Sequence, residues 1–236
     1  MVRQHVNPLS GFYQRPLALP HCAGLFAAAD QPLHLDLGCA RGRFLMTMAQ
    51  QRPHWNHLGL DIRRPLVAAA EQAREGTELT NLAFLFCNAN VSLAGLLRQL
   101  PPGLLQLVTI QYPDPWFKAR HRKRRMVQPA LIESLATAME KDMQLFIQSD
   151  ILELAQEMVD QVVAAGGFRR TQPHWLVQNP LPIPSEREIH VLRQGLPVYR
   201  ALFIRDDSSP ADTSPQPGIT GASEAGDEVP GRTAEA

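Results

Sequence analysis

From residue 33 onward, short apolar runs alternate with longer helical stretches, and this alternation constrains the fold more than any other feature. Strands separated by helices of about ten to fifteen residues form βαβ units, whose parallel strands are covered by helices on both faces. The sequence therefore predicts an α/β fold with a doubly wound, mostly parallel, Rossmann-like sheet. The predicted strands are 33–37, 57–61, 82–87, 105–111 and 143–148, and the predicted helices are 42–51, 65–75, 91–99, 126–140 and 151–165.

The pattern changes beyond Phe168, where strand-like pieces replace the alternation. Two such pieces, 174–178 and 198–205, predict an antiparallel hairpin at the edge of the sheet. Residues 31–205 are thus expected to form one domain, preceded by an irregular N-terminal arm over 1–30. The segment 206–236 lacks aromatic residues and is rich in proline, serine, glycine and acids, so we expect a disordered acidic tail.

The distribution of charge matters more than its total, which is formally zero. Because the tail holds 7 of the 23 acidic residues, residues 1–205 carry 22 basic against 16 acidic residues, a net charge of +6. The three cysteines are widely spaced without a CxxC pair, which indicates neither a disulfide framework nor a zinc site. No apolar run is long enough to span a bilayer and no signal peptide is visible, so we expect a cytoplasmic protein.

Much of the positive charge lies in residues 112–125, YPDPWFKARHRKRR. Pro113 and Pro115 restrict the backbone on either side of Asp114, and Trp116 follows directly. A fixed carboxylate beside a flat ring suits recognition of a planar polar group, and the adjacent cations suit phosphates. The alternative is a proline-stiffened loop followed by a solvated basic segment.

Polar side chains also follow three successive predicted strands. Asp36 precedes a glycine-containing turn in which Gly38 and Gly42 allow a close backbone approach, Asp61 ends the second strand, and Asn88 ends the third. Ligands of open α/β sheets bind beyond the carboxyl ends of the strands. A carboxylate at the Asp61 position suits ribose hydroxyls, and an amide at Asn88 suits an adenine edge. The three positions together predict a nucleoside-binding site.

Two nucleoside ligands fit such a site, a nicotinamide dinucleotide and S-adenosyl-L-methionine. A dinucleotide normally requires GxGxxG to place its pyrophosphate at a helix N-terminus, and Cys39-Ala40-Arg41 separates the glycines here. S-adenosylmethionine has no phosphate but carries an ammonium and a sulfonium, for which Asp36 is a suitable partner. A methyltransferase is therefore favoured over an oxidoreductase.

Three motifs, LDLGCARGRFL, GLDIRRP and QYPDPWFKARHRKRR, resemble those of the bacterial tRNA (guanine-N7-)-methyltransferase family. The resemblance covers about residues 30–205 and is most specific in the PDPW segment. It implies a class I S-adenosylmethionine-dependent methyltransferase fold, with tRNA as partner and methylation of a guanine of the variable loop, of the guanine-46 type. It implies neither a metal nor a membrane partner, and it leaves monomer and homodimer open.

The resemblance also assigns residues by position. It implies that the cofactor is bound by Asp36, Gly38, Asp61, Asn88 and Asp114, and that Asp114 is also the catalytic residue. The substrate would be bound by Lys118, Asp150 and Glu188. The RNA would be contacted by Arg120, His121, Arg122, Lys123, Arg124 and Arg125. The chain departs from the family at Asn88, where many relatives have Asp. It departs again at 185–188, where SERE stands for the family's TxxE pattern and keeps Glu188.

The reaction itself needs little acid–base chemistry, because guanine N7 has an exposed lone pair and no proton to lose. We expect Asp114, and secondarily Asp150, to accept hydrogen bonds from the base as positive charge develops on it. Asp150 can instead cap the helix over 151–165, and Trp116 can either stack on an extruded base or pack in the core. The rival functions are a catalytically silent RNA-binding subunit and a methyltransferase for another acceptor.

Overall fold

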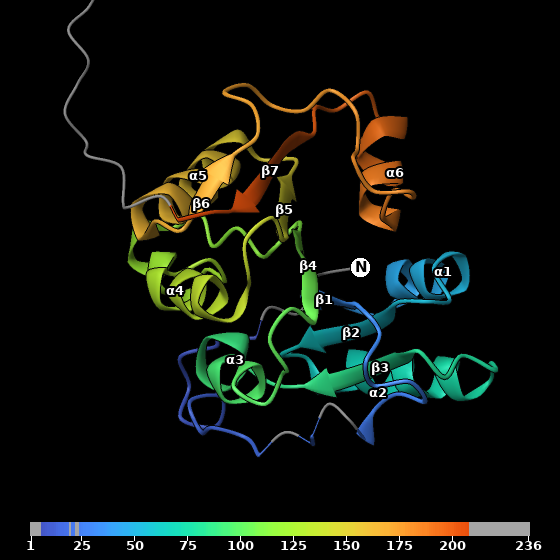
Figure 1. Ribbon diagram of the computed structural model, residues 1–236. Helices are drawn as coiled ribbons and strands as arrows, with labels where there is room; N and C mark the ends of the chain where they lie inside the picture. Colours follow the sequence, from blue (N-terminus) through green and yellow to red (C-terminus); the bar gives the residue numbers. More distant parts are fainter. Residues whose placement is uncertain (1–5, 19, 22–23, 208–236) are drawn as a thin grey trace, which may run out of the picture.

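The computed structural model describes residues 6–18, 20–21 and 24–207, and its centre is a sheet in the order β3-β2-β1-β4-β5-β7-β6 (Figure 1). The strands are β1 (Leu33–Leu37), β2 (Asn56–Asp61), β3 (Leu82–Phe86), β4 (Leu105–Gln111), β5 (Gln144–Ser149), β6 (Phe168–Arg170) and β7 (Tyr199–Arg205). β1 to β5 pair in parallel, whereas β7 runs antiparallel to both β5 and β6. The predicted fold class is confirmed.

Two layers of helices cover the sheet. The helices are α1 (Arg43–Gln51), α2 (Arg64–Glu75), α3 (Ala89–Leu97), α4 (Pro129–Ala138), α5 (Leu152–Ala165) and α6 (Glu186–Arg193), with a 3₁₀ segment η2 at Ala119–Arg124. Figure 1 shows α3, α4 and α5 on one side of the sheet and α1, α2 and α6 on the other. The central strands are consequently buried on both faces, and every residue of β1 is buried. This burial on both faces also encloses the polar residues His34 and Asp36 of β1.

The strand order reverses direction at β1. The chain proceeds from β1 outward through β2 and β3, then returns to pair β4 with the other side of β1. The loops after β1 and β4 therefore diverge to opposite faces and leave a crevice at the carboxyl ends of the strands. The sequence thus places the turn after β1 and the PDPW segment after β4 on two sides of one crevice.

One predicted strand is wrong, and one helix was not predicted. Residues 174–178 are not a strand; the hairpin partner of β7 is β6, directly after Gly166–Gly167. Trp175 gave the segment its strand-like pattern, but its ring packs against Tyr199 at 5.6 Å. The unpredicted helix is α6, whose first turn is capped by the Ser185 hydroxyl accepting from the Glu188 N–H. Ser-x-x-Glu is a helix-start signal, and its glutamate, Glu188, is predicted from the sequence only to bind substrate.

The described part of the N-terminal arm lies against the carboxyl ends of β3 and the start of α3. The Tyr13 and Phe86 rings lie 6.3 Å apart, and the Leu17 N–H donates to the Ser92 hydroxyl at 3.2 Å. These contacts bring a segment far away in sequence to the edge of the crevice. The predicted disordered tail falls, from residue 208 on, outside the described residues.

Candidate functional site

A cavity of about 330 Å³ occupies the crevice beyond β1, β2 and β4. Five residues predicted from the sequence line it together: Asp36, Gly38, Asp61, Asn88 and Asp114. Of the predicted RNA-binding residues 120–125, only Arg124 lines the cavity. The predicted substrate-binding residues Lys118, Asp150 and Glu188 do not line it. The cavity therefore joins the predicted nucleoside residues to the predicted catalytic carboxylate.

The turn between β1 and α1 forms the floor of the cavity. Gly38 and Gly42 have φ angles of 90° and 68°, in the left-handed region that favours glycine. A Cβ on Gly42 would lie 2.2 Å from Cζ of Phe84, so the turn also requires the absence of a side chain there. The Gly38 N–H donates to the Leu60 carbonyl at 2.7 Å and fixes the turn to β2.

Asp36 lies at the end of β1, only 5 % exposed, and accepts a 2.6 Å hydrogen bond from the Thr109 hydroxyl. Burial raises the pKa of Asp36 to about 6, against hydrogen bonds from Thr109 and Gln111 that lower it. The buried carboxylate therefore lacks charge compensation. A cationic group of a ligand would stabilise its ionised form.

Asp61 is engaged by the polypeptide on both oxygens. Oδ2 accepts from the Ala40 N–H at 2.9 Å, and Oδ1 accepts from the Arg63 N–H at 2.8 Å. The Arg63 guanidinium also binds this carboxylate, at 3.1 Å and 3.2 Å. Asp61 thus ties together the loops after β1 and β2, and a carboxylate oxygen can accept a further hydrogen bond from a ligand.

Asn88 caps α3, because its Oδ1 accepts from the Asn90 N–H at 3.2 Å. Its Nδ2 donates to the carbonyls of Pro8 and Tyr13, both at 3.2 Å. The amide donors are thus directed at the N-terminal arm, and Oδ1 retains one lone pair. Pro8 itself lines the cavity, so the arm contributes a wall that the sequence motifs did not indicate.

The PDPW turn is held in an unusual conformation. Tyr112 and Trp116 both have left-handed backbones, with φ angles of 50° and 42°, and such conformations cost roughly 1 kcal/mol or more for residues with side chains. They enclose Asp114 from both ends. Strain of this size persists only where the surrounding structure imposes it.

Arg125, predicted from the sequence to contact RNA, supplies that restraint. Its side chain is 3 % exposed, with Nε donating to the Pro115 carbonyl at 2.8 Å and Nη1 paired with Glu157 of α5. A guanidinium so enclosed has no surface left for a phosphate. Arg125 instead anchors the PDPW turn to α5.

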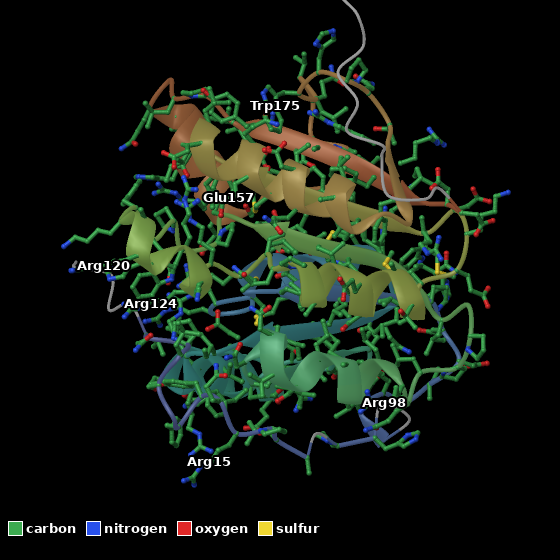
Figure 2. The ribbon with its side chains drawn as sticks, turned by 90° about the vertical axis from the view of Figure 1, so that its left-hand side faces the viewer. Arg15, Arg98, Arg120, Arg124, Glu157 and Trp175 are labelled. Atoms are coloured by element: carbon green, nitrogen blue, oxygen red, sulfur yellow. The ribbon has the colours of Figure 1, made fainter. Side chains whose placement is uncertain are left out.

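The other cationic residues of the segment 118–125 differ in their contacts. Lys118, Arg120, Arg122 and Lys123 are all exposed, and Arg122 also lies 3.6 Å from Glu153 and 3.7 Å from Glu157. Figure 2 shows Arg120 and Arg124 at one edge of the molecule, with Arg98 towards the opposite edge. Because Arg124 lines the cavity, the exposed cations around η2 form a cationic surface beside the crevice.

Trp116 lies inside this group of cations. The Arg124 guanidinium is 5.0 Å from its ring centroid, and the His121 ring meets it edge-on at 5.5 Å. The neighbouring Phe117 is 73 % exposed, although the sequence reasoning did not select it. Trp116 therefore already has protein partners, and Phe117 is the more accessible ring.

Asp150 does not cap α5, so that alternative is wrong. The hydroxyl of Ser149 accepts from the Ile151 N–H at 3.1 Å, while Asp150 pairs with Arg187 at 2.5 Å. Arg187 lines the cavity and was not selected from the sequence. It connects Asp150, after β5, to the start of α6.

Glu188, predicted from the sequence to bind substrate, is buried. It is 1 % exposed, pairs with Arg200 at 2.6 Å and accepts from Asn179 at 2.6 Å. Gln148 also donates to it at 3.2 Å. Its role is to fix α6 against β5 and β7, so that Ser185, Glu186 and Arg187 face the cavity.

The fold and this crevice define a class I methyltransferase. The 16S rRNA methyltransferase KamB superimposes with a TM-score of 0.53 at 15 % identity, covering 78 % of this chain and 90 % of that one, which shows the common fold. Residues 30–201 match the model of a family described as putative methyltransferase.

Close relatives narrow the class. The chain is 56 % identical over 211 residues to the tRNA (guanine-N7-)-methyltransferase of Synechococcus elongatus, covering 89 % of this chain and 98 % of the relative. It is 52 % identical over 216 residues to that of Prochlorococcus marinus, covering 90 % and 92 %. The chain belongs to the tRNA (guanine-N7-)-methyltransferase family, which confirms the resemblance.

Two further observations concern partners. Within residues 6–18, 20–21 and 24–207, no cluster of histidine, cysteine, aspartate or glutamate is arranged to hold a metal ion. None of the helices in this part of the chain is long and apolar enough to cross a membrane.

Proposed function

We propose that this protein transfers a methyl group from S-adenosylmethionine to N7 of a guanine in the variable loop of tRNA, at the position-46 type of site. The observation that carries the proposal is the shared cavity, which joins Asp36, Asp61 and Asn88 to Asp114 with cations at its edge. The names of the relatives support tRNA and guanine N7 as the acceptor. We place the reaction in the cytoplasm, where tRNA is available.

The residues of the cavity fit S-adenosylmethionine better than a dinucleotide. Asp36 is a buried carboxylate in need of a cation, and it would hold the ligand's ammonium. Asp61 would accept from the ribose hydroxyls and Asn88 would face the adenine. When bound, S-adenosylmethionine supplies an electrophilic methyl group on a positively charged sulfur.

Asp114 is the proposed catalytic residue. Its carboxylate would accept hydrogen bonds from N1–H and the exocyclic amine of guanine, and these bonds strengthen as positive charge develops on the purine. The N7 lone pair needs no general base. Asp114 therefore contributes orientation and charge stabilisation, and alignment of reactants can supply several kcal/mol of barrier lowering.

The cationic surface is proposed to hold the tRNA backbone. Lys118, Arg120 and Lys123 are exposed beside the crevice, so they can reach phosphates without breaking internal ion pairs. Asp150 is a second candidate for contact with the base, positioned by Arg187. Base contacts at the cavity and phosphate contacts around it together specify a nucleotide within a folded RNA.

The test is transfer of tritium from methyl-labelled S-adenosylmethionine to bulk tRNA, followed by mapping of the modified base. We expect 7-methylguanine in the variable loop. Asp114→Asn should abolish most transfer while cofactor binding persists, whereas Asp160→Asn, on an exposed part of α5, should transfer normally.

Each alternative outcome has a distinct meaning. Cofactor binding without transfer to any tRNA would indicate a silent RNA-binding subunit or another acceptor. Label at a different tRNA position would correct the site of methylation alone. Normal transfer by Asp114→Asn would refute the catalytic role of that carboxylate.

A further inference from the structure

A row of polar side chains crosses the sheet beneath the cavity, and the motifs described above do not account for it. His34 and Asp36 lie on one face of β1, because they are two residues apart. His57 of β2 is the cross-strand partner of His34, and Thr109 of β4 is the partner of Asp36. β2, β1 and β4 are adjacent in Figure 1, so the register alone places the four side chains on one face.

Hydrogen bonds connect the row from end to end. His57 Nδ1 lies 3.2 Å from His34 Nδ1, and His34 Nε2 lies 3.0 Å from the Thr109 hydroxyl. Thr109 then donates to Asp36 Oδ1 at 2.6 Å. Only Asp36 lines the cavity, so the row connects the catalytic crevice to the interior of the sheet.

This row is enclosed by apolar packing. His34, His57 and Thr109 are each 0 % exposed, and the Phe44 ring of α1 meets the His34 ring edge-on at 5.9 Å. Burying polar groups in such a layer is costly unless every partner is satisfied. One atom is unsatisfied, since His57 Nε2 is buried without a hydrogen-bond partner.

The ionised state of Asp36 fixes the direction of every hydrogen bond. A carboxylate only accepts, so Thr109 donates to it and must accept from His34 Nε2–H. Neutral His34 then has a bare Nδ1, which accepts from His57 Nδ1–H. This leaves His57 Nε2 bare.

Protonation of Asp36 would reverse this direction. The acid would donate to Thr109, Thr109 to His34 Nε2, and His34 Nδ1–H to His57 Nδ1. The row would gain one proton in total, with each histidine still neutral and its single proton on the other nitrogen. The tautomers of His34 and His57 therefore report the charge of Asp36.

We propose that His34 and His57 are positioning residues of the cofactor site, which hold the Thr109 hydroxyl as a donor to Asp36 and so keep that carboxylate ionised and directed at the cofactor's ammonium. The assignment of the ammonium rests on the proposed function. The direction of the row does not, because it follows from the hydrogen-bonded contacts of the row and the charge of Asp36.

Other charged groups act on the same carboxylate and histidines. Burial is the main influence on the pKa of Asp36 and raises it; Asp61 at the end of β2 raises it further, and Gln111 of β4 lowers it. Burial lowers the pKa of His57 to about 4; the backbone of Arg52 raises this pKa and the charge of Arg52 lowers it. Burial, His57 and Arg52 all lower the pKa of His34. Both imidazoles are thus neutral at physiological pH.

The first test is nitrogen-15 NMR of the full-length protein without ligand. At pH 8 we expect neutral His34 with its proton on Nε2 and neutral His57 with its proton on Nδ1. On acidification through the titration of Asp36, both tautomers should change together. A charged imidazole at pH 8, the opposite tautomers, or independent changes would overturn the proposal, whether or not the protein methylates tRNA.

The second test measures S-adenosylmethionine affinity by calorimetry between pH 5.5 and 9. Thr109→Val removes the donor, so the pH midpoint for binding should rise by about one unit, which corresponds to a roughly tenfold loss of affinity below the midpoint that recovers at high pH. His34→Leu should shift the midpoint in the same direction, and His34→Gln, which keeps a donor near Nε2, should restore it.

Val108→Ala is the matched control, since Val108 is buried on the opposite face of β4 and pairs with Leu35, away from the row. It should lower thermal stability without moving the midpoint. An equal loss of affinity at every pH in Thr109→Val would show a structural role only and refute the proposal. Wild-type protein that binds no S-adenosylmethionine would refute the proposed function, while the tautomers still decide the direction of the row.

Discussion

Replacing Asp36 with asparagine should stabilise the free protein while abolishing its cofactor affinity. Burial raises the pKa of Asp36 from an ordinary value of 3.8 to about 6. The folded protein therefore keeps a proton that the unfolded chain loses between these two pH values. Above the folded pKa, the protein retains a buried charge that its own groups do not fully compensate.

The sign and size follow from proton linkage. Because the folded state binds more protons than the unfolded state between about pH 4 and 6, stability falls as pH rises through this window. The shift corresponds to a destabilisation of the folded protein by about 3 kcal/mol. This destabilisation is absent below the unfolded pKa and fully present above pH 6. Asp36→Asn has no such titration and should be more stable by up to about that amount at pH 7.5.

Urea unfolding of both proteins at a series of pH values between 4.5 and 8 measures this difference. We expect a stability gain that grows with pH, together with loss of S-adenosylmethionine binding. Asp160→Asn should show no such growth. A gain independent of pH, or a mutant less stable than the wild type at pH 7.5, would refute the electrostatic reasoning.

Three further changes have expected outcomes. Glu157→Gln leaves buried Arg125 with only the more distant Glu153 carboxylate at 3.9 Å, so stability should fall by about 3 kcal/mol and turnover should slow at unchanged tRNA affinity. A tRNA-binding defect instead would contradict the anchoring role. Phe117→Ala should weaken tRNA binding about tenfold through lost stacking, with thermal stability and the slope of log affinity against log salt unchanged, whereas a changed slope would indicate an ionic role. Gly42→Ala should prevent stable folding, because its Cβ would collide with Phe84. Gly95→Ala in α3, where a Cβ would only contact the Arg98 side chain at 3.8 Å, should stabilise by about 0.5–1 kcal/mol; circular dichroism melting compares the two variants.

The parallel core was predictable because its signal is local and repeated. β1 and β4 have the predicted boundaries, since each is a mostly buried strand rich in leucine, isoleucine or valine. The region after Phe168 was less predictable. Its apolar residues around Trp175 satisfy tertiary contacts without joining the ladder, and such packing has no period in the sequence.

The site was predictable where the backbone fixes it and less so where side-chain direction decides. Asp36, Asp61 and Asn88 follow strands, so the fold alone brings them to one crevice. Arg125 and Glu188 belong to the same motifs but are turned inward by partners on α5 and β7. Those partners are distant in sequence, and a single sequence does not show which charge will meet which.

The order in which the sheet forms has a consequence for synthesis of the chain. β7, the last strand, lies between β5 and β6, so β5 presents an unpaired edge until residues 199–205 have left the ribosome. An open edge of this kind is a template for pairing with other chains. Arg200, on that same strand, also holds Glu188 and with it the start of α6 beside the cavity. The nascent protein therefore closes its aggregation-prone edge and completes the cavity wall in a single step.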